Sequence, residues 1–188
     1  MARKRARLLC EDKLHQVFVR RLLKRLEFRV FPVDLPGGNE GAAEQYVREK
    51  FPREVSRWRA KSHQQNLALV AVIDADNCAV NERKGQLDSQ LQEQGMTVRE
   101  GEERIAILVP KRTIETWIAS LRGQSVDEQT DYKHALGLRG RESECCDAVE
   151  MLERILHLPP RQRQRELRRN HPPSLSDGCS EIDDRLPE

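Results

Sequence analysis

The sequence predicts an α/β protein: an open, mostly parallel β-sheet with helices on both faces, followed by a helical C-terminal extension. Short apolar runs alternate with longer amphipathic segments, an order that is typical of a parallel sheet. Residues 67–73 are all apolar, as expected for a central strand covered on both faces. The chain has 188 residues, enough for one core, and with 37% hydrophobic but only 4% aromatic residues that core must consist mainly of Leu, Val, Ile and Ala.

The first half of the chain alternates strands and helices. A strand is predicted over residues 6–10. It is followed by an amphipathic helix with apolar residues every three or four positions from Leu14 to Leu26. Arg20, Arg21, Lys24 and Arg25 occupy the outer side of this helix. The next predicted elements are a strand over 28–35, a turn at Pro36-Gly37-Gly38-Asn39, and a helix over 40–61 that Pro52 could divide in two.

The second half continues the pattern and then becomes helical. After the strand at 67–73 the sequence predicts a helix over 81–94, a strand over 104–109, a helix over 113–121 with Thr113 as N-cap, and a helix near 142–156. An Arg-rich stretch at 161–169 precedes a Pro-, Ser- and Asp-rich segment. The expected organisation is an α/β domain over 1–122, a helical extension packed on it over 123–169, and a C-terminal tail over 170–188.

Composition limits the class of protein. Charged residues make up 34% of the chain but the net charge is +2, which indicates a solvated surface rather than a uniformly basic one. No run approaches the roughly 20 apolar residues that span a bilayer, so we expect no membrane association. The basic N-terminus lacks a following hydrophobic segment, so we do not expect export. The five cysteines contain no paired C-x-x-C motif, which argues for a reducing, cytoplasmic setting.

Acidic residues follow several of the predicted strands. Ligands of open α/β sheets bind beyond the carboxyl ends of the strands. Glu11 follows the first predicted strand, and Asp74 and Asp76 follow the central one, projecting on the same side about 7 Å apart. The last predicted strand leads to Lys111 and, in the next helix, to Glu115.

Carboxylates gathered in this way favour a divalent cation. Two unit charges 4 Å apart repel by about 4 kcal/mol at an effective dielectric near 20, and Mg²⁺ or Mn²⁺ held by Glu11, Asp74 and Asp76 would remove this cost. Such an ion suits phosphodiester chemistry. Other roles stay open: Glu11 can be an acidic residue at a helix N-terminus, the two aspartates can be turn formers, and Glu115 can be an ordinary helix surface residue.

Three segments resemble motifs of TOPRIM-like domains, which occur in OLD-type nucleases and in small stand-alone proteins. They are Leu8-Leu-Cys-Glu-Asp-Lys13, Val72-Ile-Asp-Ala-Asp-Asn77 and Val109-Pro-Lys-Arg-Thr-Ile-Glu-Thr-Trp-Ile118. The resemblance covers residues 6–122. The chain departs from the OLD-type pattern at Glu11-Asp12, where Glu-Gly is usual, and no phosphate-binding loop of a fused ATPase is present in the sequence.

The resemblance implies a Mg²⁺- or Mn²⁺-dependent nuclease that acts on DNA or RNA beside a separate ATPase, in defence against phage or plasmids. Glu11, Asp74 and Asp76 would hold the metal, and Glu115 would be a ligand or general base. From their place at the end of the last predicted strand, Lys111 would face the phosphate and Arg112 would also contact nucleic acid.

Two other function classes remain open at the sequence level. One is an inactive TOPRIM-like subunit that binds or regulates an ATPase complex, and the other is a small-molecule phosphohydrolase. The sequence leaves homo-oligomerisation open, and it does not decide whether the stretch Arg161–Arg169 binds phosphate or an acidic partner. Lys133 is a further candidate base. The histidines show no ligand spacing and are expected at the surface or in local packing: His15, His63, His134, His157 and His171.

Overall fold

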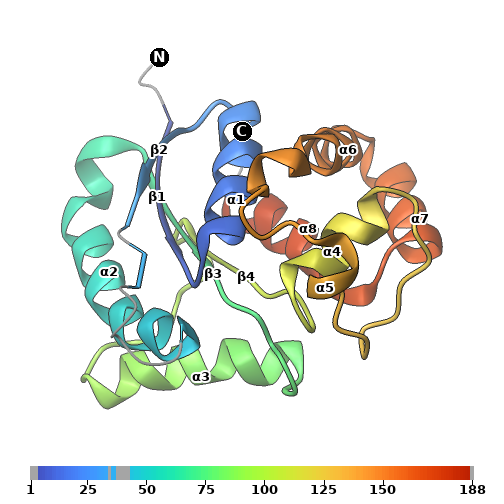
Figure 1. Ribbon diagram of the computed structural model, residues 1–188. Coiled ribbons are helices and arrows are strands. Elements are labelled where there is room, and N and C mark those ends of the chain that lie inside the picture. The colour runs from blue at the N-terminus through green and yellow to red at the C-terminus, as the bar shows by residue number, and fades with distance from the viewer. Residues whose placement is uncertain (1–3, 34, 37–42, 187–188) are drawn as a thin grey trace.

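A four-stranded parallel sheet forms the centre of the protein, as the sequence predicts. The computed structural model describes residues 4–33, 35–36 and 43–186, without the side chains of 62–65 (Figure 1). The strands are β1 (Arg5–Cys10), β2 (Arg29–Pro32), β3 (Leu67–Val72) and β4 (Ile105–Leu108). They are hydrogen-bonded in the order β2-β1-β3-β4, and every neighbouring pair is parallel.

Helices connect the strands and then form the C-terminal part of the described chain. The predicted alternation of strand and helix is confirmed through residue 121. The helices are α1 (Lys13–Arg25), α2 (Ala43–Gln65), α3 (Val80–Glu93), α4 (Ile114–Leu121), α5 (Lys133–Leu136), a 3₁₀ turn η1 (Glu142–Cys145), α6 (Cys146–Leu156), α7 (Pro160–Asn170) and α8 (Pro173–Arg185).

Each face of the sheet is covered by its own group of helices (Figure 1). All six residues of β3 are buried, and successive side chains point to opposite faces. Leu8 and Val70 face the core shared with α1, α4, α6 and α8. Leu9 and Ala71 face the core shared with α2 and α3. This explains why the central strand is a continuous apolar run rather than an alternating one.

Helix α2 is continuous through Pro52, so the division that the sequence left open does not occur. A proline inside a helix removes one backbone hydrogen bond. Packing offsets this cost, because Val47, Phe51 and Val55 are fully buried against the sheet. Trp58 also donates its indole N–H to the Leu67 carbonyl at 2.7 Å.

Strand β2 is shorter than predicted. It ends at Pro32 rather than at residue 35, and it lies at an edge of the sheet, where a proline is tolerated because no ladder hydrogen bond is lost. Residue 34, residues 37–39 of the expected turn and residues 40–42 of the expected helix lie outside the described residues.

The structure corrects the C-terminal tail predicted over 170–188, because most of it is helix α8. Leu175, Cys179 and Ile182 are buried at four- and three-residue spacing and continue the apolar stripe of a helix. The Pro, Ser and Asp residues around them obscured this pattern. Pro173 opens the helix, a position where the missing N–H costs little.

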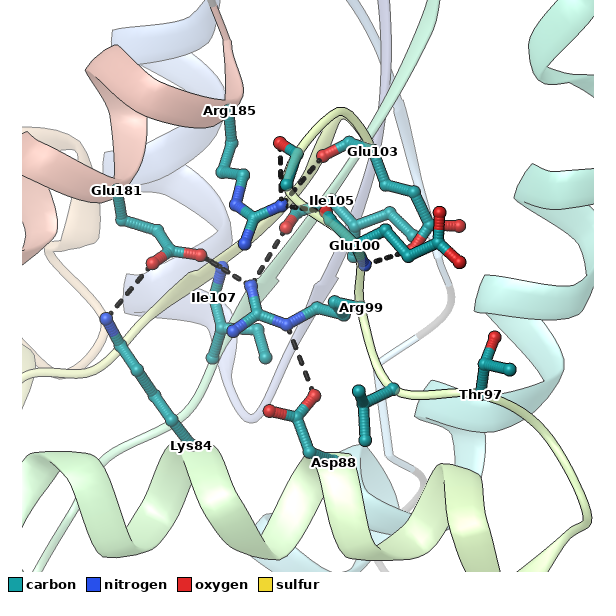
Figure 2. Close-up of polar contacts among 12 residues, drawn as sticks. Lys84, Asp88, Thr97, Arg99, Glu100, Glu103, Ile105, Ile107, Glu181 and Arg185 are labelled. Carbon is teal, nitrogen blue, oxygen red and sulfur yellow. Dashed lines mark hydrogen bonds and ion pairs between the residues drawn. The ribbon is translucent and has the colours of Figure 1, made fainter.

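Helix α8 packs beside the edge strand β4 (Figure 2). The Glu181 carboxylate accepts a hydrogen bond from the Ile107 backbone N–H at 3.0 Å. The same carboxylate pairs with Arg99 at 2.6 Å and with Lys84 at 3.1 Å. An edge strand otherwise presents unpaired backbone groups to other chains. The Glu181 carboxylate therefore satisfies one backbone N–H, that of Ile107, on the outer edge of β4.

Close contact with α4 fixes the other side of α8. Trp117 donates its indole N–H to the Ser174 hydroxyl at 2.8 Å. A Cβ added at Gly178 would lie 2.5 Å from the Trp117 ring, so only glycine permits this approach.

The three segments predicted over 1–122, 123–169 and 170–188 share one hydrophobic core. Leu8, Leu152 and Leu175, one from each predicted segment, belong to the same buried cluster. Within the part of the chain that the structure describes, no helix is both long enough and apolar enough to cross a membrane.

Replacing Glu181 by Gln should weaken the attachment of α8. Burial favours a raised pKa for Glu181, but Arg99, the Ile107 N–H and Lys84 outweigh it and hold the pKa below its ordinary value. The carboxylate therefore stabilises the fold above the ordinary Glu pKa near 4.3, and this contribution is lost as the pH falls through the lowered folded-state pKa. We expect the variant to lose about 1–3 kcal/mol of unfolding free energy at pH 7, and less at pH 3, which is below the ordinary Glu pKa.

Urea unfolding at pH 7 and pH 3 measures this difference, with the exposed Asp184→Asn on the same helix as control. Equal losses for both variants, or a loss for Glu181→Gln that does not change with pH, would contradict the assignment.

Candidate metal centre

The carboxyl ends of β1 and β3 bring Glu11 and Asp74 together. Cys10 pairs with Val72 in the parallel register, so the residues that follow the two strands emerge side by side. The Asp74 backbone N–H donates to Glu11 Oε1 at 3.0 Å. The predicted meeting of these two acidic residues at one edge of the sheet is therefore present in the structure.

Both carboxylates are removed from solvent. Glu11 is 8% exposed and Asp74 is 1% exposed. Asp74 Oδ2 is buried and has no hydrogen-bond partner in the described part of the chain. An unpartnered buried carboxylate oxygen is costly, and a bound cation is one of the few groups that would satisfy it.

His15, which the sequence placed at the surface or in local packing, is the third member of this group. Its side chain is fully buried. Nδ1 lies 2.8 Å from Asp12 Oδ1, and Nε2 lies 2.9 Å from Asp74 Oδ1. The ligand atoms of Glu11, His15 and Asp74 all lie within 4.8 Å of one another, so this group could hold a metal ion.

A sequence signal for His15 exists but is weak. His15 follows Glu11 by four residues and Asp12 by three, spacings that bring side chains together at the start of a helix. Asp12 is the N-cap of α1, and its side chain accepts from the His15 backbone N–H. Only the fold, however, shows that the ring also reaches Asp74, which lies just after β3.

Burial and like charge shift the ionisation of the group. Burial, and next the charge of Asp74, raise the pKa of Glu11 to about 8. Burial would lower the pKa of His15, but the charges of Asp74 and Asp12 outweigh it and hold this pKa well above its ordinary value. Without a metal, the buried carboxylates are thus offset by protons on Glu11 and His15.

Asp76, the second aspartate of the predicted motif, lies apart from the buried group. Its side chain is 48% exposed, and its backbone adopts φ 51°, in the left-handed region. Its Oδ2 lies 3.8 Å from the guanidinium of Arg83, a buried residue that the sequence did not single out. Arg83 also donates to the Ala75 carbonyl at 3.3 Å and pairs with Glu44. Burial and the nearby charge of Asp74 raise the pKa of Asp76.

Glu115 is buried in the first turn of α4, rather than on the helix surface. Burial raises its pKa, and the charge of Asp74 acts in the same direction. Glu115 is thus close enough to Asp74 for their charges to interact, although it is not one of the three residues whose ligand atoms lie within 4.8 Å.

The two predicted phosphate-facing cations contact the loop after β3. Lys111 donates to the Cys78 carbonyl, and Arg112 donates to Asn77 Oδ1. Both therefore brace the loop that carries the aspartates. Lys133, at the start of α5, is exposed, and the charges of Asp74 and then Glu115 raise its pKa against the effect of burial.

No protein-family model, no curated protein and no solved structure matches the chain.

Replacing Glu11 by Gln should stabilise the metal-free protein at alkaline pH. The pKa of Glu11 is about 8 in the folded protein and near 4.3 in an unfolded chain. Between these pH values Glu11 is protonated mainly in the folded state. Stability therefore falls as the pH rises from about 4.5 to 8. Gln cannot ionise, so at pH 8.5 we expect the variant to be more stable by about 2 kcal/mol, with little difference at pH 4.5.

Thermal unfolding in the presence of a chelator between pH 4.5 and 9 gives this comparison. Glu93→Gln, on the exposed surface of α3, is the matched control. Parallel pH profiles for wild type and Glu11→Gln would show that Glu11 ionises normally.

Proposed function

We propose that the protein is a divalent-metal-dependent nuclease of the TOPRIM-like type, hydrolysing phosphodiester bonds in DNA or RNA. The observation that carries the proposal is the pair of adjacent buried carboxylates, Glu11 and Asp74, with Asp74 Oδ2 left without a hydrogen-bond partner in the described residues. This arrangement is costly without a cation and favourable with one.

The donor set suits Mg²⁺ or Mn²⁺, since both prefer carboxylate oxygens. Glu11 and Asp74 would hold the ion, and Asp76 would reach it by turning from Arg83. Bound there, the ion would offset charge on the phosphate and lower the pKa of a water molecule. In this proposal Glu115 is a further ligand or the general base, because burial raises its pKa above the ordinary Glu value and so makes it a better proton acceptor.

Cationic side chains beside the carboxylates would hold the phosphate backbone. Lys133 is exposed, and its charge interacts with those of Asp74 and Glu115. Lys111 and Arg112 lie at the same edge of the sheet, on the loop side. We propose that Lys133 contacts a substrate phosphate directly, with Lys111 and Arg112 lining the approach.

The cellular role rests on the resemblance described from the sequence. It supports a subunit that would work with a separate ATPase against phage or plasmids, and the cysteine content supports a cytoplasmic setting. A second candidate is an inactive TOPRIM-like subunit that regulates such an ATPase. One observation favours this second role: His15 and Arg83 already supply positive charge next to Asp74 and Asp76, so the site is partly neutralised without a metal.

Replacing Asp74 by Ala should abolish cleavage. We expect at least a hundredfold loss of Mg²⁺- or Mn²⁺-dependent nicking of plasmid DNA or of RNA cleavage, because the variant lacks the carboxylate central to the site. Cleavage by purified wild type and variant is compared on gels, with and without a chelator.

Asp184→Ala, which removes an exposed carboxylate from α8, is the control and should cleave normally. Metal-independent cleavage that survives Asp74→Ala would exclude the nuclease assignment. Metal binding without any cleavage, together with co-purification of an ATPase, would select the inactive subunit instead.

Replacing Lys133 by Ala should weaken nucleic-acid binding. Loss of one phosphate contact is expected to lower affinity several-fold and to reduce the slope of log K against log salt by about 0.7 to 0.9. Fluorescence anisotropy across a salt series measures both quantities. Lys24→Ala, an exposed lysine near the other end of α1, should leave both unchanged, and equal effects of the two variants would argue against a specific contact.

A further inference from the structure

His15 lies between two carboxylates rather than beside one. Its Nδ1 contacts Asp12 Oδ1 at 2.8 Å and its Nε2 contacts Asp74 Oδ1 at 2.9 Å. The ring is fully buried, so no substrate can reach it. Whatever His15 does for the site, it must do through the two residues that it contacts.

These contacts leave the imidazole without a free lone pair for a metal. A hydrogen bond between a ring nitrogen and a carboxyl oxygen occupies that nitrogen, whichever of the two atoms carries the proton. Both nitrogens of His15 face carboxylate oxygens at hydrogen-bonding distance. Both ring nitrogens of His15 are therefore engaged by the protein, although its position alone would qualify it as a ligand.

Asp74 and Glu11 each have one carboxylate oxygen that is hydrogen-bonded within the protein. Asp74 Oδ1 is hydrogen-bonded to His15 Nε2, and Glu11 Oε1 accepts a hydrogen bond from the Asp74 backbone N–H. The other oxygen of Asp74, Oδ2, is buried and has no hydrogen-bond partner in the part of the chain described. The geometry thus divides the Asp74 carboxylate into one oxygen held by the protein and one left for a cation.

Asp12 in turn holds His15. The same oxygen, Asp12 Oδ1, accepts from the His15 backbone N–H at 3.0 Å and from the ring at 2.8 Å. One N-cap side chain therefore fixes both the first turn of α1 and the orientation of the imidazole.

We infer that His15 is a positioning residue, oriented by Asp12, that aims Asp74 at a divalent cation and is not itself a metal ligand. The inference rests on the proposed function only in requiring a cation at Glu11 and Asp74. It makes the donor set all oxygen, which favours Mg²⁺ and Mn²⁺ over Zn²⁺, an ion that binds imidazole well. It also adds Asp12 to the functional residues, although no ligand atom of Asp12 is needed at the ion.

Manganese affinity separates the roles of the residues. Loss of a residue that hydrogen-bonds to a metal ligand typically lowers metal affinity 10- to 100-fold. His15→Leu should therefore bind Mn²⁺ about 10- to 100-fold more weakly than wild type. His15→Gln, whose amide can still donate to Asp74, should recover most of that affinity. Asp12→Asn keeps an N-cap side chain but removes its charge. Its Mn²⁺ affinity should lie between those of His15→Leu and His15→Gln. His157→Gln, which replaces the exposed C-cap histidine of α6, is the control and should bind Mn²⁺ as wild type does.

Electron spin echo spectroscopy of the Mn²⁺-loaded protein tests coordination directly. The expected wild-type spectrum shows no nitrogen bound to the ion. A coordinated-nitrogen signal that disappears in His15→Gln would identify His15 as a ligand and overturn the inference. Unchanged Mn²⁺ affinity in His15→Leu would overturn it as well.

The outcomes also separate this inference from the nuclease proposal. Mn²⁺ binding with the expected order of affinities but no cleavage would refute the nuclease and leave the role of His15 intact. No Mn²⁺ binding by the wild type would refute both. If His15→Leu does not fold, as judged by circular dichroism, the comparison of His15→Gln and Asp12→Asn with wild type decides the question.

Discussion

The need to balance buried negative charge at one edge of the sheet governs this site. Glu11 and Asp74 are placed there by the ends of two adjacent parallel strands, and neither is solvated. Unbalanced, such charges would repel strongly. His15, fixed by the first turn of α1, supplies the nearest positive group, and Arg83 from α3 supplies another beside Asp76. Helices on opposite faces of the sheet thus each supply a positive group to one of the two aspartates after β3.

This balance gives the site two ionic states. Protons on His15 and Glu11 offset the carboxylates when no ion is bound, whereas a divalent ion would offset them in the proposed active form. Ion binding would then release a proton from Glu11, so the two processes are linked through pH.

The sequence was a good guide wherever the signal is local or follows from sheet topology. The apolar run at 67–73 identified β3, and the rule that parallel strands share a carboxyl edge placed Glu11 beside Asp74. His15 was missed because a histidine among apolar helix residues usually serves only local packing, and its second contact lies 59 residues away. Helix α8 was missed because its apolar stripe is interspersed with Pro, Ser, Asp and Gly. The bracing roles of Lys111 and Arg112 depend on a loop conformation that no local pattern encodes.

The packing of α8 along β4 restricts how copies of this chain, or a partner, can associate. Strand addition needs a free row of backbone donors and acceptors, and Glu181 already occupies the Ile107 N–H on that side. The opposite border, β2, has four residues and is only partly buried. Within the described residues, α8 therefore opposes growth of the sheet at β4, whereas β2 forms the other border of the sheet.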